Sequence, residues 1–277
     1  ADMAGSQKTL DATLTRRDQG FHRRENTDVR NQHAEVCQLE LLCLQHCQSS
    51  GRSSRFKSHR KEDNLLLGGL TGNLHGVKWR VDNAHIAAIG TKAEDIDTVV
   101  VTHLHYDHAG NFGLFPNAEF LIQDKEMAFA TSRYMKYPAV RRPYEPDHVC
   151  EMVRLNFGER ARFIDGDEEI APGISVHLMP GHSHGQMSVQ VNTARGRVFV
   201  ASDAAHFYDN IWKRNPFSIL QHIPEYCDSH DRMIRMAESP DHIIPGHDPL
   251  VLEVYPKHPD DDGVVDLTQP PSRPTGP

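Results

Sequence analysis

The 277-residue sequence lacks a run of about 18 apolar residues and lacks an apolar segment between charged and small residues near its start. A transmembrane helix needs the former and a secretory signal the latter, so we expect no membrane partner, no export and a cytoplasmic location. The five cysteines are odd in number and unevenly spaced. They form no recognisable disulfide framework, which fits a reducing compartment.

A surplus of positive charge is also missing, since the formal net charge is -8 at pH 7. Contacts with phosphates need a basic surface, so we expect no nucleic-acid partner. The 38% hydrophobic and 25% charged residues are typical of a globular protein. The length allows one large α/β domain or two small ones, and a homodimer is left open.

Strand-like apolar runs are almost absent from residues 1–62, which are rich in Arg, Gln, Ser and Asn. We expect this N-terminal segment to be disordered or partly helical, with one amphipathic helix over Ala34–Cys47. A globular domain is expected over 63–256, and an acidic, then Pro-rich tail over 257–277 is expected to be disordered. Within the domain, three prolines in Met135–Val149 predict a long irregular loop.

Three histidines and an aspartate directly follow a β-branched strand in the segment 99–110, VVVTHLHYDHAG. Imidazole and carboxylate are ligands that borderline divalent metals prefer. Residues two apart in an extended chain project to the same side, so His103 and His105 are expected at one metal, with Asp107 and His108 at a second. A solitary histidine is usually an ordinary core or surface residue, and the chain has 19. The clustering favours a metal site here.

The same pattern, a strand followed by a metal ligand, recurs three times later in the chain. PGHSHG contains His182, ASDAAH contains Asp203 and His206, and PGHD contains His247. Because α/β sheets place their sites at strand ends, we expect these segments to converge with the first.

HLHYDH, PGHSHG, ASDAAH and PGHD together resemble the metallo-β-lactamase superfamily, an α/β fold built as an αβ/βα four-layer sandwich. The resemblance implies two divalent metal ions, expected to be Zn²⁺, with Asp203 bridging them. It assigns one metal to His103, His105 and His182, and the other to Asp107, His108 and His247. The family's N-terminal half-sheet is not recognisable in residues 1–80, so we expect an incomplete N-terminal β-layer.

Within that superfamily, ASDAAHFY, SPDHIIPGHDPLV and HLHYDHAGN most resemble the N-acyl homoserine lactonases, enzymes of quorum quenching. The resemblance implies a zinc hydrolase that opens a small-molecule lactone or ester by attack of a metal-bridging hydroxide. Asp107 is expected to pass a proton to the leaving alkoxide. Those lactonases have a Tyr three residues after the bridging Asp, where this sequence has His206. Tyr208 follows two residues later.

We expect His206 to act in catalysis by hydrogen-bonding the oxyanion, and both His206 and Tyr208 to bind substrate. Two alternatives stay open at this point. One is a thioester hydrolase similar to glyoxalase II, and the other is a non-catalytic or incompletely folded relative of the family.

Overall fold

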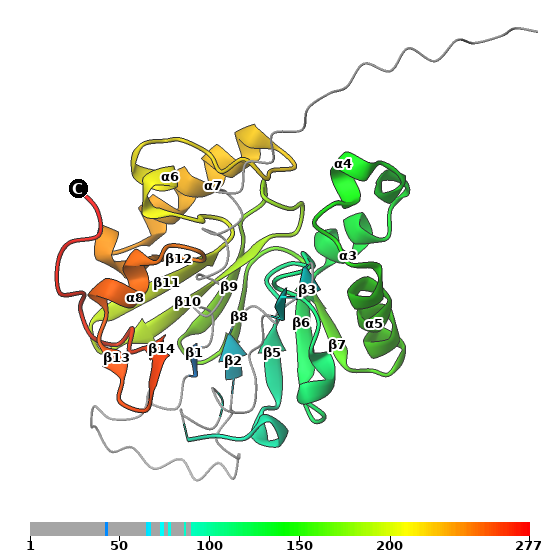
Figure 1. Ribbon diagram of the computed structural model, residues 1–277, viewed down its shortest axis with the longest axis horizontal. Coiled ribbons are helices and arrows are strands. Elements are labelled where there is room, and N and C mark those ends of the chain that lie inside the picture. The colour runs from blue at the N-terminus through cyan, green and yellow to red at the C-terminus, as the bar shows by residue number, and fades with distance from the viewer. Residues whose placement is uncertain (1–41, 44–64, 68–72, 75–76, 79–85, 87–89) are drawn as a thin grey trace, which may run out of the picture.

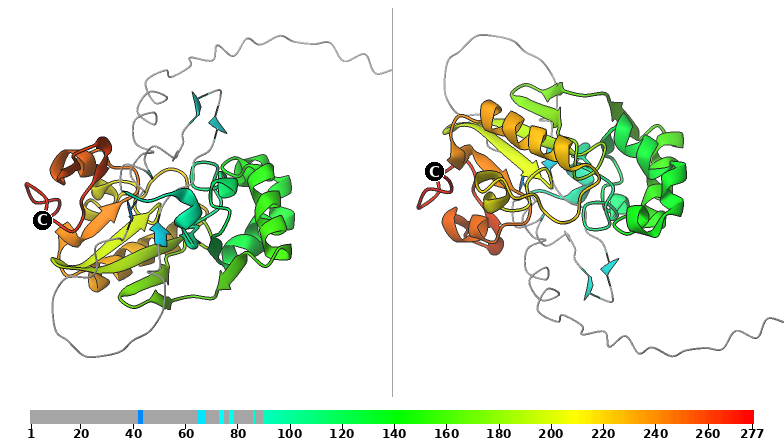
Figure 2. Two further views of the ribbon diagram at one scale, coloured as in Figure 1. Left: turned by 90° about the horizontal axis from the view of Figure 1, so that it is seen from below. Right: turned by 90° about the horizontal axis from the view of Figure 1, so that it is seen from above.

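Two β-sheets face each other in the computed structural model, which describes residues 42–43, 65–67, 73–74, 77–78, 86 and 90–277 (Figure 1). Helices lie along the outer side of each sheet, and the views from below and above show the two sheets between these helical layers (Figure 2). Among the described residues, no helix has the length and apolar character needed to cross a bilayer.

The first sheet is mostly parallel and has the strand order β1-β2-β5-β6-β7. Its strands are β1 (Leu42–Cys43), β2 (Leu65–Leu67), β5 (Thr98–Val100), β6 (Glu119–Gln123) and β7 (Ala161–Ile164). Only β1 runs antiparallel to its neighbour. Val99 and Val100 point to opposite faces of the sheet and both are fully buried, because a parallel sheet in a layered fold is covered on both sides.

The second sheet has the order β12-β11-β10-β9-β8. Its strands are β8 (Glu168–Ala171), β9 (Ile174–Leu178), β10 (Met187–Thr193), β11 (Gly196–Ser202) and β12 (Ile243–Pro245). Strands β8 to β11 are antiparallel, and β12 is parallel to β11. The carboxyl ends of β9, β11 and β12 therefore meet at one edge of the sheet.

Apolar side chains from both sheets interlock between them. Val100, Leu121 and Ile164 of the first sheet contact a cluster from the second, Val176, Met187, Val189 and Val191. On its outer face the first sheet packs against α3 (Asp124–Ala130) and α5 (Pro146–Phe157). The second sheet packs against α6 (Tyr208–Trp212) and α7 (Ile223–Met236). These faces form the four-layer αβ/βα arrangement predicted from the motifs.

The predicted irregular loop over Met135–Val149 is wrong in large part. The structure has a 3₁₀ turn at Arg133–Lys136, then α4 (Pro138–Arg141), and α5 begins at Pro146. Pro138 and Pro146 occupy the first positions of their helices, where the missing N–H would have had no partner in any case. Prolines in this segment start helices rather than prevent them.

The predicted disordered tail over 257–277 is also wrong. Strands β13 (Lys257–His258) and β14 (Asp261–Val265) form a hairpin after α8 (Leu250–Val254). Leu267 packs with residues of α8 and β11, and the Trp212 Nε1–H donates to the Thr275 carbonyl at 3.1 Å. A few apolar and hydrogen-bonding side chains fix a segment that its charge and proline content mark as disordered.

Most of the N-terminal segment 1–62 lies outside the described residues. The helix predicted over Ala34–Cys47 is wrong at Leu42–Cys43, which form β1, and the rest of that helix lies outside the described part. The hairpin β3 (Asn73–Leu74) and β4 (Val77–Lys78) precedes the domain's central strands. An incomplete N-terminal layer stays a prediction.

Cys150 and Cys227 are both free thiols.

Asp167 ties the turn before β8 to the second sheet and to α7. Its carboxylate contacts His177 Nδ1 at 2.9 Å, accepts from the Leu178 N–H at 3.2 Å and pairs with Arg232. Partial burial opposes ionisation, but the hydrogen bonds from His177 and Arg232 hold the pKa of Asp167 below its ordinary value. The ionised carboxylate therefore stabilises the folded chain.

We expect Asp167→Asn to lower the free energy of unfolding near neutral pH by about 1 kcal/mol or less, since solvent screens this half-exposed group. The folded pKa is lowered, so the contribution is complete above the unfolded value of about 3.9 and is lost as the pH falls through the folded value. Urea unfolding of both proteins at pH 7 and at acidic pH measures this. A difference that is the same at both pH values would contradict the assignment.

Candidate metal centre

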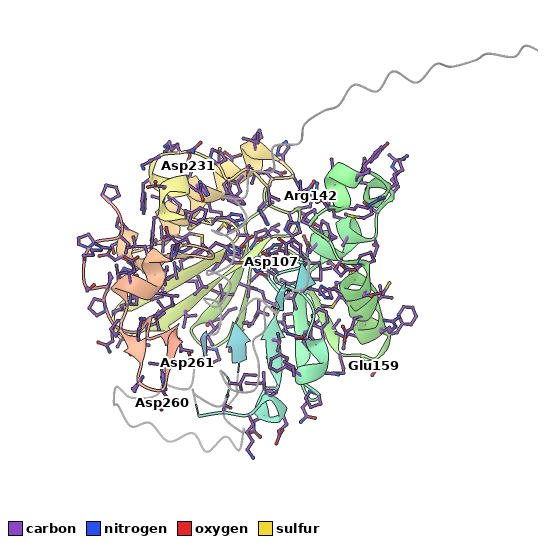
Figure 3. All side chains as sticks on the ribbon, viewed as in Figure 1. Asp107, Arg142, Glu159, Asp231, Asp260 and Asp261 are labelled. Carbon is purple, nitrogen blue, oxygen red and sulfur yellow. The ribbon has the colours of Figure 1, made fainter. Side chains whose placement is uncertain are left out.

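The predicted ligands come together at the edge where four strands end. His103, His105, Asp107 and His108 follow β5, His182 follows β9, Asp203 follows β11 and His247 follows β12. Figure 3 shows Asp107 at the centre of the molecule, between the two sheets with their helices. Sequence reasoning located this edge correctly because each motif follows an apolar strand.

Asp203 is the centre of the cluster and is 2% exposed. Its Oδ2 lies 3.1 Å from His182 Nε2 and 3.0 Å from His206 Nε2. Its Oδ1 lies 3.1 Å from His108 Nε2 and 2.9 Å from His247 Nε2. The two carboxylate oxygens thus face different sets of imidazoles, which is the arrangement that a bridging carboxylate requires.

His103, His105 and His182, called the first half below, offer ring nitrogens within 4.8 Å of one another. His105 Nδ1 lies 2.8 Å from His182 Nε2, and His103 Nε2 lies 3.8 Å from Asp203 Oδ2. The Nε2 atoms of His103 and His105 are buried and have no hydrogen-bond partner among the described residues. Buried polar atoms normally have partners, so His103 Nε2, which faces Asp203, fits a metal ligand, and His105 offers the Nδ1 atom that faces His182.

Asp107, His108 and His247, the second half, also offer ligand atoms within 4.8 Å of one another. The Asp107 Oδ2 lies 3.7 Å from His108 Nε2 and 3.9 Å from His247 Nε2. Asp107 is the most exposed of the three, with 17% of its side chain open to solvent. The two halves with Asp203 between them form a donor set of imidazoles and carboxylates that fits divalent metal ions.

Burial sets the protonation of the first half. Removal from water lowers the pKa of His103 well below its ordinary value, and the neighbouring His108 adds to the effect. Burial and His182 lower the pKa of His105 in the same way. Burial alone would raise the pKa of Asp203, but the surrounding histidines, His108 first, hold it well below its usual range. Neutral imidazoles at His103 and His105, close to the ionised Asp203, suit a cation.

Hydrogen bonds behind the ligands fix their orientation. His182 Nδ1–H donates to the Ile219 carbonyl at 2.9 Å, which leaves the Nε2 lone pair directed into the cluster. Thr102 Oγ1 lies 3.2 Å from His103 Nδ1 and accepts from Ser202 Oγ at 3.0 Å. This link joins the ends of β5 and β11 across the two sheets.

His206 lies at the centre, whereas Tyr208 does not. The His206 ring is 3% exposed and stacks on Phe217 at a centroid distance of 3.7 Å. Tyr208 is buried in the cluster that contains Val198, Val251 and Tyr255. Its backbone N–H donates to Asp248, so it anchors the His247 loop from behind. The structure places Tyr208 in the packing behind the His247 loop, which does not favour its predicted role in substrate binding.

Sequence reasoning missed three side chains next to the ligands. Tyr144 packs edge-on against His105 at 4.8 Å, and His230 donates to the Ala204 carbonyl at 2.9 Å. Glu126 is fully buried in α3 and contacts the ligand loops. No local pattern in the sequence indicates these three, because each contact joins residues that are distant in the chain.

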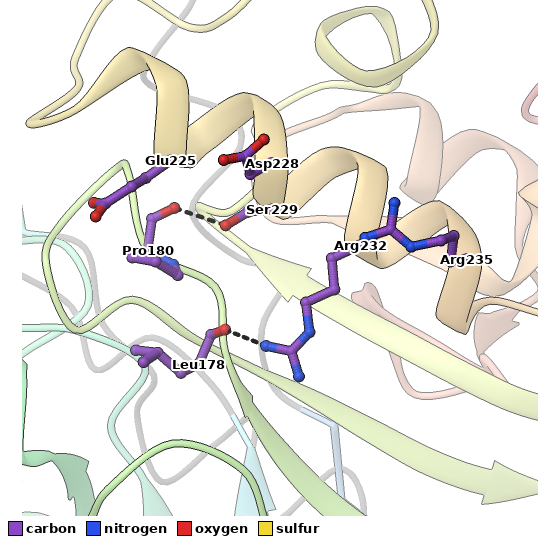
Figure 4. Close-up of a pocket in the computed structure, with 7 residues that line it drawn as sticks. All are labelled: Leu178, Pro180, Glu225, Asp228, Ser229, Arg232 and Arg235. Carbon is purple, nitrogen blue, oxygen red and sulfur yellow. Dashed lines mark hydrogen bonds between the residues drawn. The ribbon is translucent and has the colours of Figure 1, made fainter.

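A separate cavity of about 280 Å³ lies between α7 and the end of β9 (Figure 4). Ser229 Oγ donates to the Pro180 carbonyl and Arg232 Nη1 to the Leu178 carbonyl, each at 2.7 Å. None of its lining residues belongs to the metal cluster. These two hydrogen bonds attach α7 to the segment that leads to His182. The cavity therefore lies at a packing contact between α7 and β9, outside the metal cluster.

Residues 59–257 match the sequence pattern of the metallo-beta-lactamase superfamily. The chain belongs to this superfamily. Membership explains both the two-sheet sandwich and the motifs at the strand ends. The predicted fold class is confirmed.

Several relatives within the superfamily are N-acyl homoserine lactonases. The enzyme of Bacillus cereus is 33% identical over 133 residues, which are 47% of this chain and 47% of that protein. The chain thus matches about half the length of this relative. An N-acyl homoserine lactonase of Azorhizobium caulinodans is 27% identical over 190 residues, 64% of this chain and 67% of that protein. Metallo-beta-lactamase domain-containing protein 1 of Mus musculus is 30% identical over 166 residues, 58% of this chain and 52% of that protein.

Solved structures share the superfamily fold. An N-acyl homoserine lactone hydrolase with the product N-hexanoyl-L-homoserine bound at its catalytic metal center has a TM-score of 0.56 at 22% identity, over 70% of this chain and 80% of that one. AidC, a dizinc quorum-quenching lactonase, has a TM-score of 0.51 at 17% identity, over 69% and 70%. At 22% and 17% sequence identity, these structural matches show a shared fold.

We expect the purified chain to bind about two zinc ions, with His103→Ala and His247→Ala each retaining about one, because each variant damages one half. Asp203→Asn is expected to weaken both. Elemental analysis after dialysis measures the stoichiometry. His222→Ala, which removes an exposed histidine outside the cluster, serves as the control and should keep two. Retention of two tightly bound ions by His103→Ala would contradict the ligand assignment.

Proposed function

We propose that the protein is a metal-dependent hydrolase that opens a lactone ring, in an N-acyl homoserine lactone or a similar small ester. The observation that carries the proposal is the division of six side chains into two halves around Asp203. The N-acyl homoserine lactonases among the relatives support the substrate class.

Zn²⁺ is the metal that we propose, because a mixture of imidazoles and carboxylates is a donor set that zinc accepts. When bound, the two ions would supply a water of lowered pKa and a Lewis acid for the substrate carbonyl. The free thiols of Cys150 and Cys227 support a reducing, cytoplasmic location. A small-molecule substrate fits the acidic net charge, and a homodimer stays a prediction.

Asp107 holds the position from which a proton can reach the leaving group. It is the ligand with the largest exposed fraction, and its Oδ2 is nearly 4 Å from both neighbouring imidazoles. A carboxylate placed this way can take a proton from the attacking water and give it to the leaving alkoxide. No covalent intermediate with the protein is needed.

His206 is proposed to orient the substrate carbonyl. Burial lowers the pKa of His206 to about 3, so its imidazole is neutral, and its one N–H faces Asp203 Oδ2 at 3.0 Å. Its stacking on Phe217 and on His247, at 3.7 Å and 5.1 Å, fixes the ring plane. With Asp203 engaged by bound cations, this N–H would be released to donate to the developing oxyanion, and such a rigid, neutral donor stabilises the transition state.

A substrate panel tests the proposed function. N-acyl homoserine lactones and simple lactones are expected to be hydrolysed, and His103→Ala is expected to lose at least about 100-fold in kcat/KM because the metal-dependent water is lost. Acyl-glutathione thioesters serve as the competing substrates. Faster hydrolysis of the thioesters would favour a glyoxalase II-like enzyme, and a His103→Ala variant as active as its parent would exclude the mechanism.

His206→Ala is expected to lower kcat on the best lactone by about 100-fold, the usual cost of one oxyanion donor, with the metal content unchanged. The kcat of His206→Gln, whose amide can still donate a hydrogen bond, should lie between those of the parent and His206→Ala. Tyr208→Phe is the matched comparison and should stay within about threefold, since that phenol lies outside the centre. A larger loss in Tyr208→Phe than in His206→Ala would reverse the two assignments.

A further inference from the structure

Glu126 is a buried carboxylate in the described part of the chain that none of the motifs includes. It lies on α3, is fully shielded from solvent and shares the inward face of the helix with Ala130. A buried charge is costly unless it is satisfied by hydrogen bonds or by opposite charge. Its contacts therefore indicate what it is for.

Three donors from three different segments surround this carboxylate. Glu126 Oε1 accepts from the Leu104 N–H at 2.9 Å and from the Tyr144 hydroxyl at 3.2 Å. Glu126 Oε2 accepts from the Gly185 N–H at 3.0 Å. All three partners donate, which is the pattern expected of an ionised carboxylate.

Each donor is close to a ligand of the first half, two of them in the chain and one by a ring contact. Leu104 lies between His103 and His105 in the chain. The Tyr144 ring packs edge-on against His105, at 4.8 Å and 86°. Gly185 lies three residues after His182 in the loop that leaves β9. One side chain thus connects all three ligand positions of the first half.

The approach of the His182 loop to α3 requires glycine at 185. A Cβ atom at that position would lie 2.2 Å from the Glu126 backbone nitrogen, a distance that real Cβ atoms do not show. The His182 loop therefore packs directly on α3, and its hydrogen bond to the Glu126 carboxylate fixes its position there. The second half has separate support, since the His247 N–H donates to the His206 carbonyl at 3.0 Å.

Opposite charge is missing around Glu126. Among the described side chains, its hydrogen-bond partners are neutral, and no Lys, Arg or His is paired with it. A cation held by His103, His105 and His182 would lie just beyond these partners and would compensate the buried charge.

We propose that Glu126 is a positioning residue for the first half, which it preorganises for a divalent cation by holding Leu104, Tyr144 and Gly185. The inference rests on the proposed metal-dependent function. Removal of such support behind metal ligands typically costs 10- to 100-fold in metal affinity. We expect this loss of metal affinity in the first half alone. A general loss of packing would weaken metal binding in both halves.

Glu126→Gln tests the proposal, because the side chain keeps its size but loses its charge and the second acceptor for Gly185. We combine it with His247→Ala, which leaves the first half, and with His103→Ala, which leaves the second. Zn²⁺ affinity measured by competition with a chelator is expected to fall about 10- to 100-fold in the first background and less than about threefold in the second. The visible spectrum of bound Co²⁺ should change only in the first.

Asp124→Asn is the matched control, since it removes one negative charge from the exposed side of the same helix and should leave both affinities unchanged. Tyr144→Phe removes a single donor and keeps the carboxylate, so it gives a folded test if Glu126→Gln does not fold. We expect Tyr144→Phe to weaken the first half by about threefold or more. Circular dichroism establishes that each variant is folded.

Equal losses in both backgrounds, or unchanged affinity of the first half in Glu126→Gln and in a folded Tyr144→Phe, would overturn the proposal. Those results would leave the proposed hydrolase intact. A parent chain that binds no divalent ion would instead refute the proposed function itself, so the two failures are distinguishable.

Discussion

The Asp203 carboxylate and the histidines around it are the interaction on which the site depends. Its two oxygens face His182 and His206 on one side and His108 and His247 on the other, all within 3.1 Å. Those histidines come from both sheets, so the sandwich has to close before the cluster exists. A buried carboxylate needs hydrogen bonds or opposite charge, which imidazole N–H groups and the proposed cations would supply.

The clustering of the proposed ligands was predictable from the sequence because each follows a short apolar strand, and strand ends in this kind of fold meet at one edge. His103, His105 and His182 needed no knowledge of distant contacts beyond that rule. Tyr208 was misplaced because its distance from Asp203 in the chain says nothing about the side to which its ring turns. Its ring packs with Val198 and Tyr255.

Other features depend on contacts that no local pattern encodes. Glu126 acts through donors 18 to 59 residues away in the chain. The tail over 257–277 is ordered by contacts of Leu267 and Thr275 with distant elements, despite its composition. Prolines mark turns in one context and helix starts in another, which explains the error at Met135–Val149.

The central claim is that two divalent ions lie on either side of Asp203. Anomalous X-ray diffraction from crystals of the zinc-loaded chain, recorded at the zinc absorption edge, tests it most directly. The account predicts two peaks, one within reach of His103, His105 and His182 and the other within reach of Asp107, His108 and His247, each also touching one Asp203 oxygen. A single peak, or peaks away from Asp203, would contradict it.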